Sequence, residues 1–118
     1  DVSDMLPAVA QGAIGVEIRG GDAATAALVA PLDDRPTALA VETERAFLAR
    51  LEGSCRTPIA GLARIHGDEI AFEGEILPPD GSVSLKTTRC GPISHRIRLA
   101  EDAADELKAR GGPAFFRA

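Results

Sequence analysis

The sequence lacks tryptophan and tyrosine altogether, and four phenylalanines are the only aromatic residues among its 118. Its apolar fraction of 45% is ordinary for a soluble globular protein. The length allows one domain with a core of its own and excludes two domains of ordinary size. We therefore expect one compact unit with an attached segment, and an aliphatic core.

Cysteine is also scarce, with Cys55 and Cys90 far apart in the chain. The two form no CxxC pair, and neither His66 nor His95 has a partner at the spacing of metal ligands. The density of cysteines is far below that of a secreted disulfide scaffold. We expect two reduced thiols and no metal site, with His66 in a turn and His95 just before a helix.

Positive charge is in deficit, because 13 lysines and arginines face 18 aspartates and glutamates, for a net charge of -5. This balance opposes binding to nucleic acid or to an anionic membrane surface. No apolar run approaches the roughly 20 residues of a membrane span, and the first residues lack the basic and apolar parts of a signal peptide. We expect a cytoplasmic protein with neither a nucleic-acid nor a membrane partner.

Residues 12–19 alternate apolar and polar side chains, the period of two that predicts a strand with one buried face. Two glycines break the pattern, and Asp22 can cap a short helix that ends before Pro31. The chain opens without an initiator methionine. We expect residues 1–33 to be the end of an N-terminal and central α/β region of a longer polypeptide, and residues 34–118 to be a separate domain.

This second part reads as an α+β fold in the order α-β-β-β-α. Helical spacing covers residues 36–52, with Asp34 as N-cap and Gly53 just past the end, and again residues 98–110. Strand-like runs separated by turn sequences lie between them, at residues 58–65, 69–77 and 83–89. We expect a three-stranded antiparallel sheet with helices on one face. The other face should expose Glu73, Glu75, Lys86 and Thr88.

Glu44 is out of place in the first of these helices. It falls inside the apolar stripe, between Leu48 and Leu51 on the helical wheel. A buried carboxylate needs a partner. An ion pair with a nearby arginine and a position at the edge of the stripe both explain it.

The α-β-β-β-α order is shared with double-stranded-RNA-binding domains, so fold order alone leaves a binding module open. Such a domain needs a basic stripe for phosphates. The last helix here begins Ala100-Glu101-Asp102. The charge pattern therefore argues against RNA binding.

Two strings carry more information than the fold class. They are LPAVAQGAIGVEIR, residues 6–19, and ETERAFLARLEGSCRTPIAG, residues 42–61. Together, and in this order and spacing, they resemble two sequence blocks of the porphobilinogen deaminases (hydroxymethylbilane synthases). The resemblance covers most of the chain and is weak after Ile65. It implies that the chain is the C-terminal portion of such an enzyme.

The resemblance assigns a role to Cys55. In the family, a cysteine at this position holds a dipyrromethane primer as a thioether. Porphobilinogen loses ammonia to leave an electrophilic methylene-pyrrolenine, which a thiolate traps. Four more pyrroles are added head to tail to the two of the primer, and water then releases hydroxymethylbilane. The implied partners are thus porphobilinogen and the growing oligopyrrole, and the implied cofactor is dipyrromethane, with no metal.

The resemblance also implies what this chain does not carry. The family's catalytic aspartate, and the arginines and lysines that hold the substrate carboxylates, belong to earlier sequence. We expect no catalytic residue here, no activity of this chain alone, and no primer on it. The missing N-terminal domains would be its partners, and copies of a free fragment should associate through the exposed strand at residues 12–19.

Several positions depart from the family pattern or stay undecided. Ala10, Ser54 and Ala60 stand where glycine is frequent, and Ser54 restricts the loop before the cysteine. Gln11, Gly12 and Ser54 are candidates for shaping the chain near the active-site cleft, and for Gln11 and Gly12 a purely structural turn is the alternative. Cys90 lies outside both strings, and we interpret it as structural. The rival interpretation of the whole chain is a non-catalytic α+β module that keeps this fold and in which Cys55 carries nothing.

Overall fold

The computed structural model describes residues 1–51 and 58–116. Three α-helices, three strands and short 3-10 turns make up the described chain. In order they are α1 (Ala23–Val29), a 3-10 turn (Ala30–Leu32), α2 (Arg35–Arg50), β1 (Ile59–His66), β2 (Glu69–Ile76), β3 (Leu85–Pro92), a second 3-10 turn (Ile93–His95), α3 (Arg96–Gly111) and a third (Pro113–Phe116). The predicted α-β-β-β-α order from α2 onward is confirmed.

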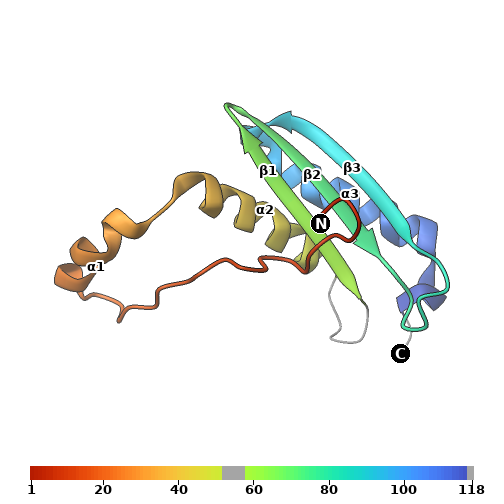
Figure 1. The fold of residues 1–118 in the computed structure, drawn as a ribbon, viewed down its shortest axis with the longest axis horizontal. Helices are drawn as coiled ribbons and strands as arrows, with labels where there is room; N and C mark the ends of the chain where they lie inside the picture. The colour runs from red at the N-terminus through yellow and green to blue at the C-terminus, as the bar shows by residue number, and fades with distance from the viewer. Residues whose placement is uncertain (52–57, 117–118) are drawn as a thin grey trace.

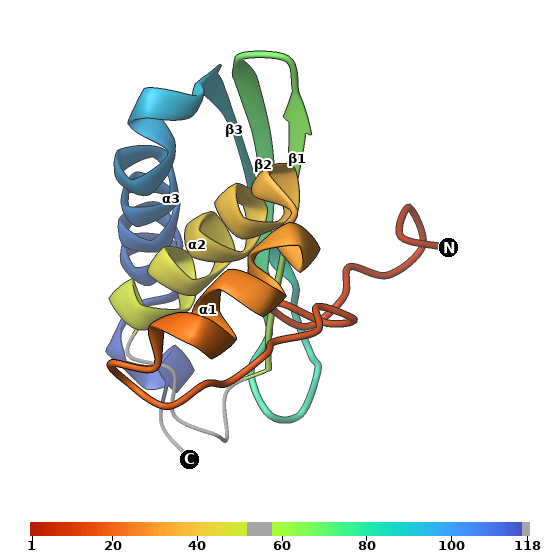
Figure 2. The same cartoon turned by 90° about the vertical axis from the view of Figure 1, so that its left-hand side faces the viewer.

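Two layers build this part of the molecule (Figure 1). The strands form one antiparallel sheet in the order β1-β2-β3. Helices α2 and α3 lie side by side on one face of it, with α2 against β1 and α3 against β3. Figure 2 shows the N-terminus beyond the sheet, on the side opposite the helices. The predicted sheet with helices on one face is therefore confirmed.

Helix starts follow the caps that the sequence offers. The Asp22 carboxylate accepts a hydrogen bond from the backbone N–H of Thr25 at 3.0 Å, and that of Asp34 from Thr37 at 3.2 Å. Each satisfies an N–H that the first helical turn leaves without a partner. Both predicted N-caps are confirmed. Gly53, predicted to follow the end of α2, lies outside the described residues.

The third strand was predicted too early, at residues 83–89. It runs from Leu85 to Pro92 because it pairs with the whole of β2, from Ile76↔Leu85 to Glu69↔Pro92. Gly91 allows this continuation, since Leu99 of α3 lies 3.0 Å from where a Cβ would stand. Tertiary packing here overrides the weak strand propensity of Cys-Gly-Pro.

The predicted strand at residues 12–19 is wrong for the described chain. These residues carry no strand assignment and run as an extended trace between the sheet and α1 (Figure 1). The apolar side chains of the alternation remain in solvent, with Ile14 93% exposed and Val16 56% exposed. A strand needs a partner for its backbone groups, and no described strand lies beside this one.

The core between sheet and helices is mainly aliphatic, as expected, with two aromatic rings packed against each other within it. Phe47 of α2 and Phe72 of β2 are both fully buried, with ring centroids 4.9 Å apart at 60°. Alanines on the buried face of α3 let that helix approach the sheet closely. Around the rings pack Leu51, Ile70, Ile76, Ala100, Ala103, Ala104 and Leu107.

The opposite face of the sheet is less open than predicted. Glu73, Lys86 and Thr88 are exposed as expected. Glu75 is only 8% exposed. Its carboxylate accepts a hydrogen bond from the Ser84 hydroxyl and lies 3.8 Å from the Lys86 ammonium. The β2–β3 loop thus covers a residue that strand alternation alone places in water.

The Phe47 ring packs directly against Gly74, in space that a larger side chain would fill. This contact can be tested by substitution. A Cβ at Gly74 would lie 2.6 Å from Phe47 Cζ, too close for any real contact. Gly74→Ala should therefore lower the free energy of unfolding by about 1–3 kcal/mol, as overpacked cores do. Gly15→Ala is the matched control, because nothing lies within 4 Å of its Cβ position, and it should change stability by less than about 0.5 kcal/mol. Urea denaturation of both variants measures the difference, and equal stabilities would contradict this packing.

Candidate functional site

The residue expected to hold the primer, Cys55, lies outside the described residues, as does Ser54. The structure does describe the two ends of the connection that carries them. On one side α2 ends beside the buried Leu51, whose N–H donates to the Phe47 carbonyl at 3.1 Å. On the other, the Pro58 carbonyl accepts from the Leu77 N–H at 3.1 Å, at the start of β1. Both ends are anchored in the helix and sheet layers.

The first string of the resemblance runs beside the second in space. The Gly61 N–H, on the outer edge of β1, donates to the Pro7 carbonyl at 3.1 Å. Ala8 forms an isolated antiparallel bridge with Ala60. Residues 7–8 thus add a short stretch of backbone to the β1 edge, only a few positions after Cys55 in the chain. Two strings separated by more than 20 residues form one structural unit.

Gln11 closes a turn immediately after this bridge. Its backbone N–H donates to the Ala8 carbonyl at 3.1 Å, and its side-chain Oε1 accepts from the Ala8 N–H at 3.1 Å. Gly12 follows at a φ of +83°, which glycine adopts without steric strain. Both residues are exposed. These contacts build a turn at the point where the N-terminal segment leaves the sheet edge.

Ala10 takes a backbone conformation that explains one departure from the family pattern. Its φ is +59°, and it is the one non-glycine residue with positive φ among the described residues. The left-handed region costs an L-residue about 1–2 kcal/mol. A glycine at this position, frequent in the pattern that the sequence resembles, would avoid this cost. In this chain the surrounding hydrogen bonds must hold Ala10 in place.

Glu44 supplies the most important of those hydrogen bonds. Its side chain is 6% exposed. One carboxylate oxygen accepts from the Ala10 N–H at 2.8 Å, and the other accepts from the Ala63 N–H of β1 at 3.2 Å. Charge-assisted bonds of this kind are about twice as strong as neutral ones. The partners found for Glu44 are thus two backbone amides, and neither is the arginine that the sequence left open.

The Glu44 carboxylate consequently joins α2, β1 and the N-terminal segment. Helix α2 leads into the connection with Cys55, and β1 leads away from it. Sequence reasoning identified the misplaced carboxylate and gave it no role, because no local pattern shows that two backbone amides converge on it. A glutamate inside an apolar stripe was the available signal.

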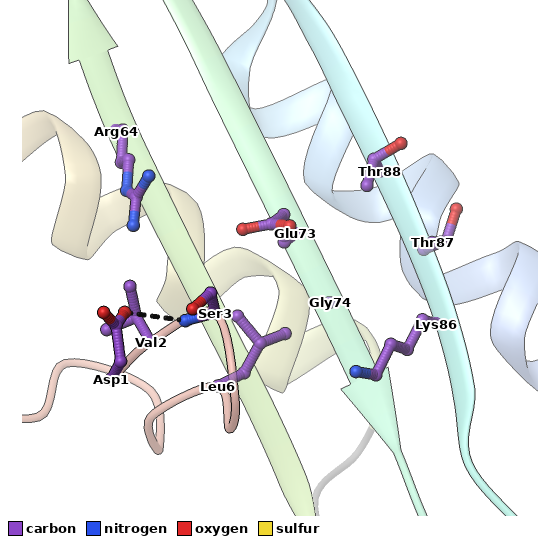
Figure 3. Close-up of a pocket in the computed structure, with 10 residues that line it drawn as sticks. All are labelled: Asp1, Val2, Ser3, Leu6, Arg64, Glu73, Gly74, Lys86, Thr87 and Thr88. Atoms are coloured by element: carbon purple, nitrogen blue, oxygen red, sulfur yellow. Dashed lines mark hydrogen bonds between the residues drawn. The ribbon is translucent and has the colours of Figure 1, made fainter.

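A hollow of about 480 Å³ lies on the sheet face opposite the helices (Figure 3). The N-terminal turn borders it, closed by a hydrogen bond from the Ser3 N–H to the Asp1 carboxylate at 3.0 Å. Its charges are mixed, with Arg64 and Lys86 against Asp1 and Glu73, so it does not suit a polyanion. No residue expected to act in the site lines it. The lining residues are Asp1, Val2, Ser3, Leu6, Arg64, Glu73, Gly74, Lys86, Thr87 and Thr88.

The remaining candidates contribute no site in the described part of the chain. Cys90 is a free, exposed thiol on β3. His66 ends β1, and His95 precedes α3. Within residues 1–51 and 58–116, no group of three or more His, Cys, Asp or Glu side chains is arranged to hold a metal ion. Across the same residues, no helix is both long and apolar enough to cross a membrane.

Known proteins similar to this chain share one description. Residues 38–109 match the family described as porphobilinogen deaminase, C-terminal domain. The chain is 55% identical over 113 residues to the porphobilinogen deaminase of Paracoccus denitrificans, covering 96% of this chain and 36% of that protein. Porphobilinogen deaminases of Nitrobacter hamburgensis and Nitrobacter winogradskyi are each 47% identical over 116 residues, 98% of this chain and 37% of theirs. The chain thus spans just over a third of the length of these relatives.

The match fits the sequence blocks and the fold together. It runs from α2 through the sheet into α3, and so covers the whole helix-sheet unit except its ends. Both the Glu44 carboxylate and the connection between α2 and β1 fall inside the matched residues.

The two hydrogen bonds that the Glu44 carboxylate accepts from backbone amides can be tested by substitution. Glu44→Gln keeps the shape but leaves one oxygen and one NH₂ group, so one backbone N–H faces a donor. Leaving a buried donor without its acceptor should lower the free energy of unfolding by about 1–3 kcal/mol. Thermal or urea denaturation measures this loss.

Glu42→Gln is the control, since it makes the same chemical change on the same helix. Glu42 pairs with Arg96 at 2.9 Å on an exposed surface, and such pairs contribute about 0–1 kcal/mol. If Glu42→Gln and Glu44→Gln were equally stable, the Glu44 carboxylate would not be holding the two amides.

Proposed function

Since this chain belongs to the porphobilinogen deaminase family, whose C-terminal domain it carries, we propose that it serves as the cofactor-anchoring part of a hydroxymethylbilane synthase. In that enzyme four porphobilinogen molecules are joined head to tail into hydroxymethylbilane, with release of ammonia. The primer is dipyrromethane, bound to Cys55 as a thioether. The match over residues 38–109 carries this proposal, because Cys55 lies inside it.

A thiol on this connection suits the chemistry. Loss of ammonia from porphobilinogen leaves a carbon electrophile at the methylene group. The Cys55 thiolate supplies the electron pair of the new C–S bond, and the thiol proton leaves to solvent or base. A thioether then resists the water that releases the finished tetrapyrrole. Once attached to Cys55, dipyrromethane would supply the free pyrrole carbon that the first new unit joins, and each later unit would join the ring added before it.

The structure supports an anchoring role through the neighbours of the connection. A primer must be held in a fixed place while the chain on it grows, since positioning supplies much of the rate of such a reaction. The Glu44 carboxylate ties α2 and β1 together on either side of the connection. The hydrogen bond from Ala10 to Glu44 holds the neighbouring Gln11 and Gly12 near the β1 edge of the sheet. We propose that Gln11 and Gly12 shape the wall of the cleft at this edge.

Charge supports a division of labour within the enzyme. Each added pyrrole brings two carboxylates, so the growing chain needs a basic cleft. This chain has a net charge of -5. We propose that the cleft and the catalytic carboxylate belong to the remaining, longer part of the relatives, that residues 1–33 join that part, and that residues 34–118 anchor the cofactor in the cytoplasm.

The rival function is a non-catalytic α+β module that retains the fold and carries no pyrrole. It differs from the proposal at one atom, the Cys55 sulfur. Pyrrole-specific aldehyde staining of the denatured full-length protein separates the two, because only a covalent adduct survives denaturation.

The first prediction for function concerns that sulfur in the full-length enzyme. Cys55→Ser should fold yet carry no covalent dipyrrole, because a hydroxyl at neutral pH is a far weaker nucleophile than a thiol. Cys90→Ser is the matched control and should keep the primer, since Cys90 is exposed on β3. Intact mass spectrometry measures both. The assignment would be refuted if Cys55→Ser carried two pyrroles, or if Cys90→Ser carried none.

The second prediction concerns the 118-residue chain by itself. Expressed alone, it should consume no porphobilinogen and should show the mass of an unmodified Cys55. A free thiol has a pKa of about 8.5 and is only a few per cent thiolate at neutral pH, and no described group here would generate the electrophile. Hydroxymethylbilane formation, or a dipyrrole adduct on chain produced alone, would contradict the division proposed above.

A further inference from the structure

The two edges of the sheet are closed in different ways. At the β1 edge, residues 7–8 and the Glu44 carboxylate occupy the outward N–H groups of Gly61 and Ala63. At the other edge, β3 is the outermost strand of the described sheet (Figure 1). An unpaired edge invites the addition of a further strand from another molecule.

The register identifies which groups of β3 point outward. In an antiparallel ladder, both backbone groups of a residue face the same side, and successive residues alternate. The backbone N–H of Gly61 points away from β2, toward Pro7. The backbone groups of its partner Gly74 therefore point toward β3, where Gly74 pairs with Thr87. The residues that alternate with Thr87, namely Lys86, Thr88 and Cys90, therefore direct their N–H and C=O groups outward.

Two arginines occupy carbonyls in this outward row. Arg110, from the end of α3, donates from Nη1 to the Lys86 carbonyl at 2.7 Å. Arg89 donates from Nη1 to the Thr88 carbonyl at 2.9 Å. An incoming strand would need both carbonyls as acceptors for its own N–H groups.

Glu106 of α3 holds the two guanidinium groups in place. One of its oxygens accepts from Arg89 at 2.7 Å and from the Thr87 hydroxyl at 2.8 Å, and the other accepts from Arg110 at 2.8 Å. Hydrogen bonds from Arg89, Thr87 and Arg110 lower the pKa of Glu106 to about 2. The carboxylate is thus charged at neutral pH, and the arrangement persists there.

We propose that Arg89 and Arg110, held in position by Glu106, prevent β3 from pairing in antiparallel fashion with β3 of a second copy of the chain. The strand itself is suited to such pairing, because it carries two adjacent β-branched residues, Thr87 and Thr88. Guanidinium groups seated on its carbonyls remove acceptors and place positive charge where a twofold-related copy would place its own. This role is independent of the function proposed for Cys55.

The test is backbone hydrogen exchange at low and high protein concentration. In the Arg89→Ala/Arg110→Ala variant, pairing should slow exchange of the Lys86, Thr88 and Cys90 amides by roughly tenfold or more at high concentration. The natural chain should show no such concentration dependence. Arg64→Ala/Arg98→Ala is the matched control, since it removes the same charge from two exposed residues that lie elsewhere.

Each outcome decides the proposal. A folded double variant whose β3 amides exchange equally fast at both concentrations would overturn it, as would equal slowing in the control or in the natural chain. If only the amides of residues 12–19 exchanged more slowly at high concentration, the copies would associate through that segment instead. This result would also contradict the role proposed for Arg89 and Arg110. If the double variant does not fold, Arg110→Ala alone decides, because its side chain is 44% exposed and its loss should give a smaller slowing at Lys86 and Thr88.

Discussion

The Glu44 carboxylate is the contact on which the arrangement around the candidate site depends. It lies buried on α2 and accepts hydrogen bonds from Ala10 and Ala63, one in the N-terminal segment and one in β1. Burying a charge without such partners would be strongly unfavourable. The same bonds that make Glu44 tolerable therefore fix three parts of the chain relative to one another. They also offset part of the strain of Ala10 at a φ of +59°.

Packing one helical turn further along α2 completes this constraint. Glu44 and Phe47 are three residues apart, so they project from the same side of α2. Phe47 packs on Gly74 of the central strand while Glu44 reaches the edge strand. One helix face thus sets both the depth and the lateral position of α2 on the sheet. The connection with Cys55 begins just beyond this face, and we infer that a covalent anchor gains a fixed origin from it.

Local signals in the sequence predicted the parts of the fold that local physics decides. The caps at Asp22 and Asp34 and the turns between strands act within a few residues, and the structure confirms them. The strand at residues 12–19 failed because strand formation requires a partner that the described chain does not provide. Glu75 was misplaced because a loop, not the strand period, covers it.

The candidate site divides in the same way. The motif around Cys55 predicts it as the anchor, and this stays a prediction, whereas Glu44 stood out by its position in an apolar stripe. The partners of Glu44 were not predictable, because Ala10 and Ala63 are distant in sequence and contribute only backbone N–H groups, which every residue except proline has. The left-handed conformation of Ala10 likewise left no trace except that glycine is frequent at this position in the pattern that the sequence resembles.

Scalar coupling across hydrogen bonds tests the central contact most directly. In isotopically labelled chain, NMR should detect coupling from the amide nitrogens of Ala10 and Ala63 to the same carboxyl carbon, that of Glu44. Both couplings should be present in the folded chain, because each carboxylate oxygen accepts one of the two hydrogen bonds. Absence of either coupling in the folded chain, or coupling of either amide to a different acceptor, would contradict the role assigned to Glu44.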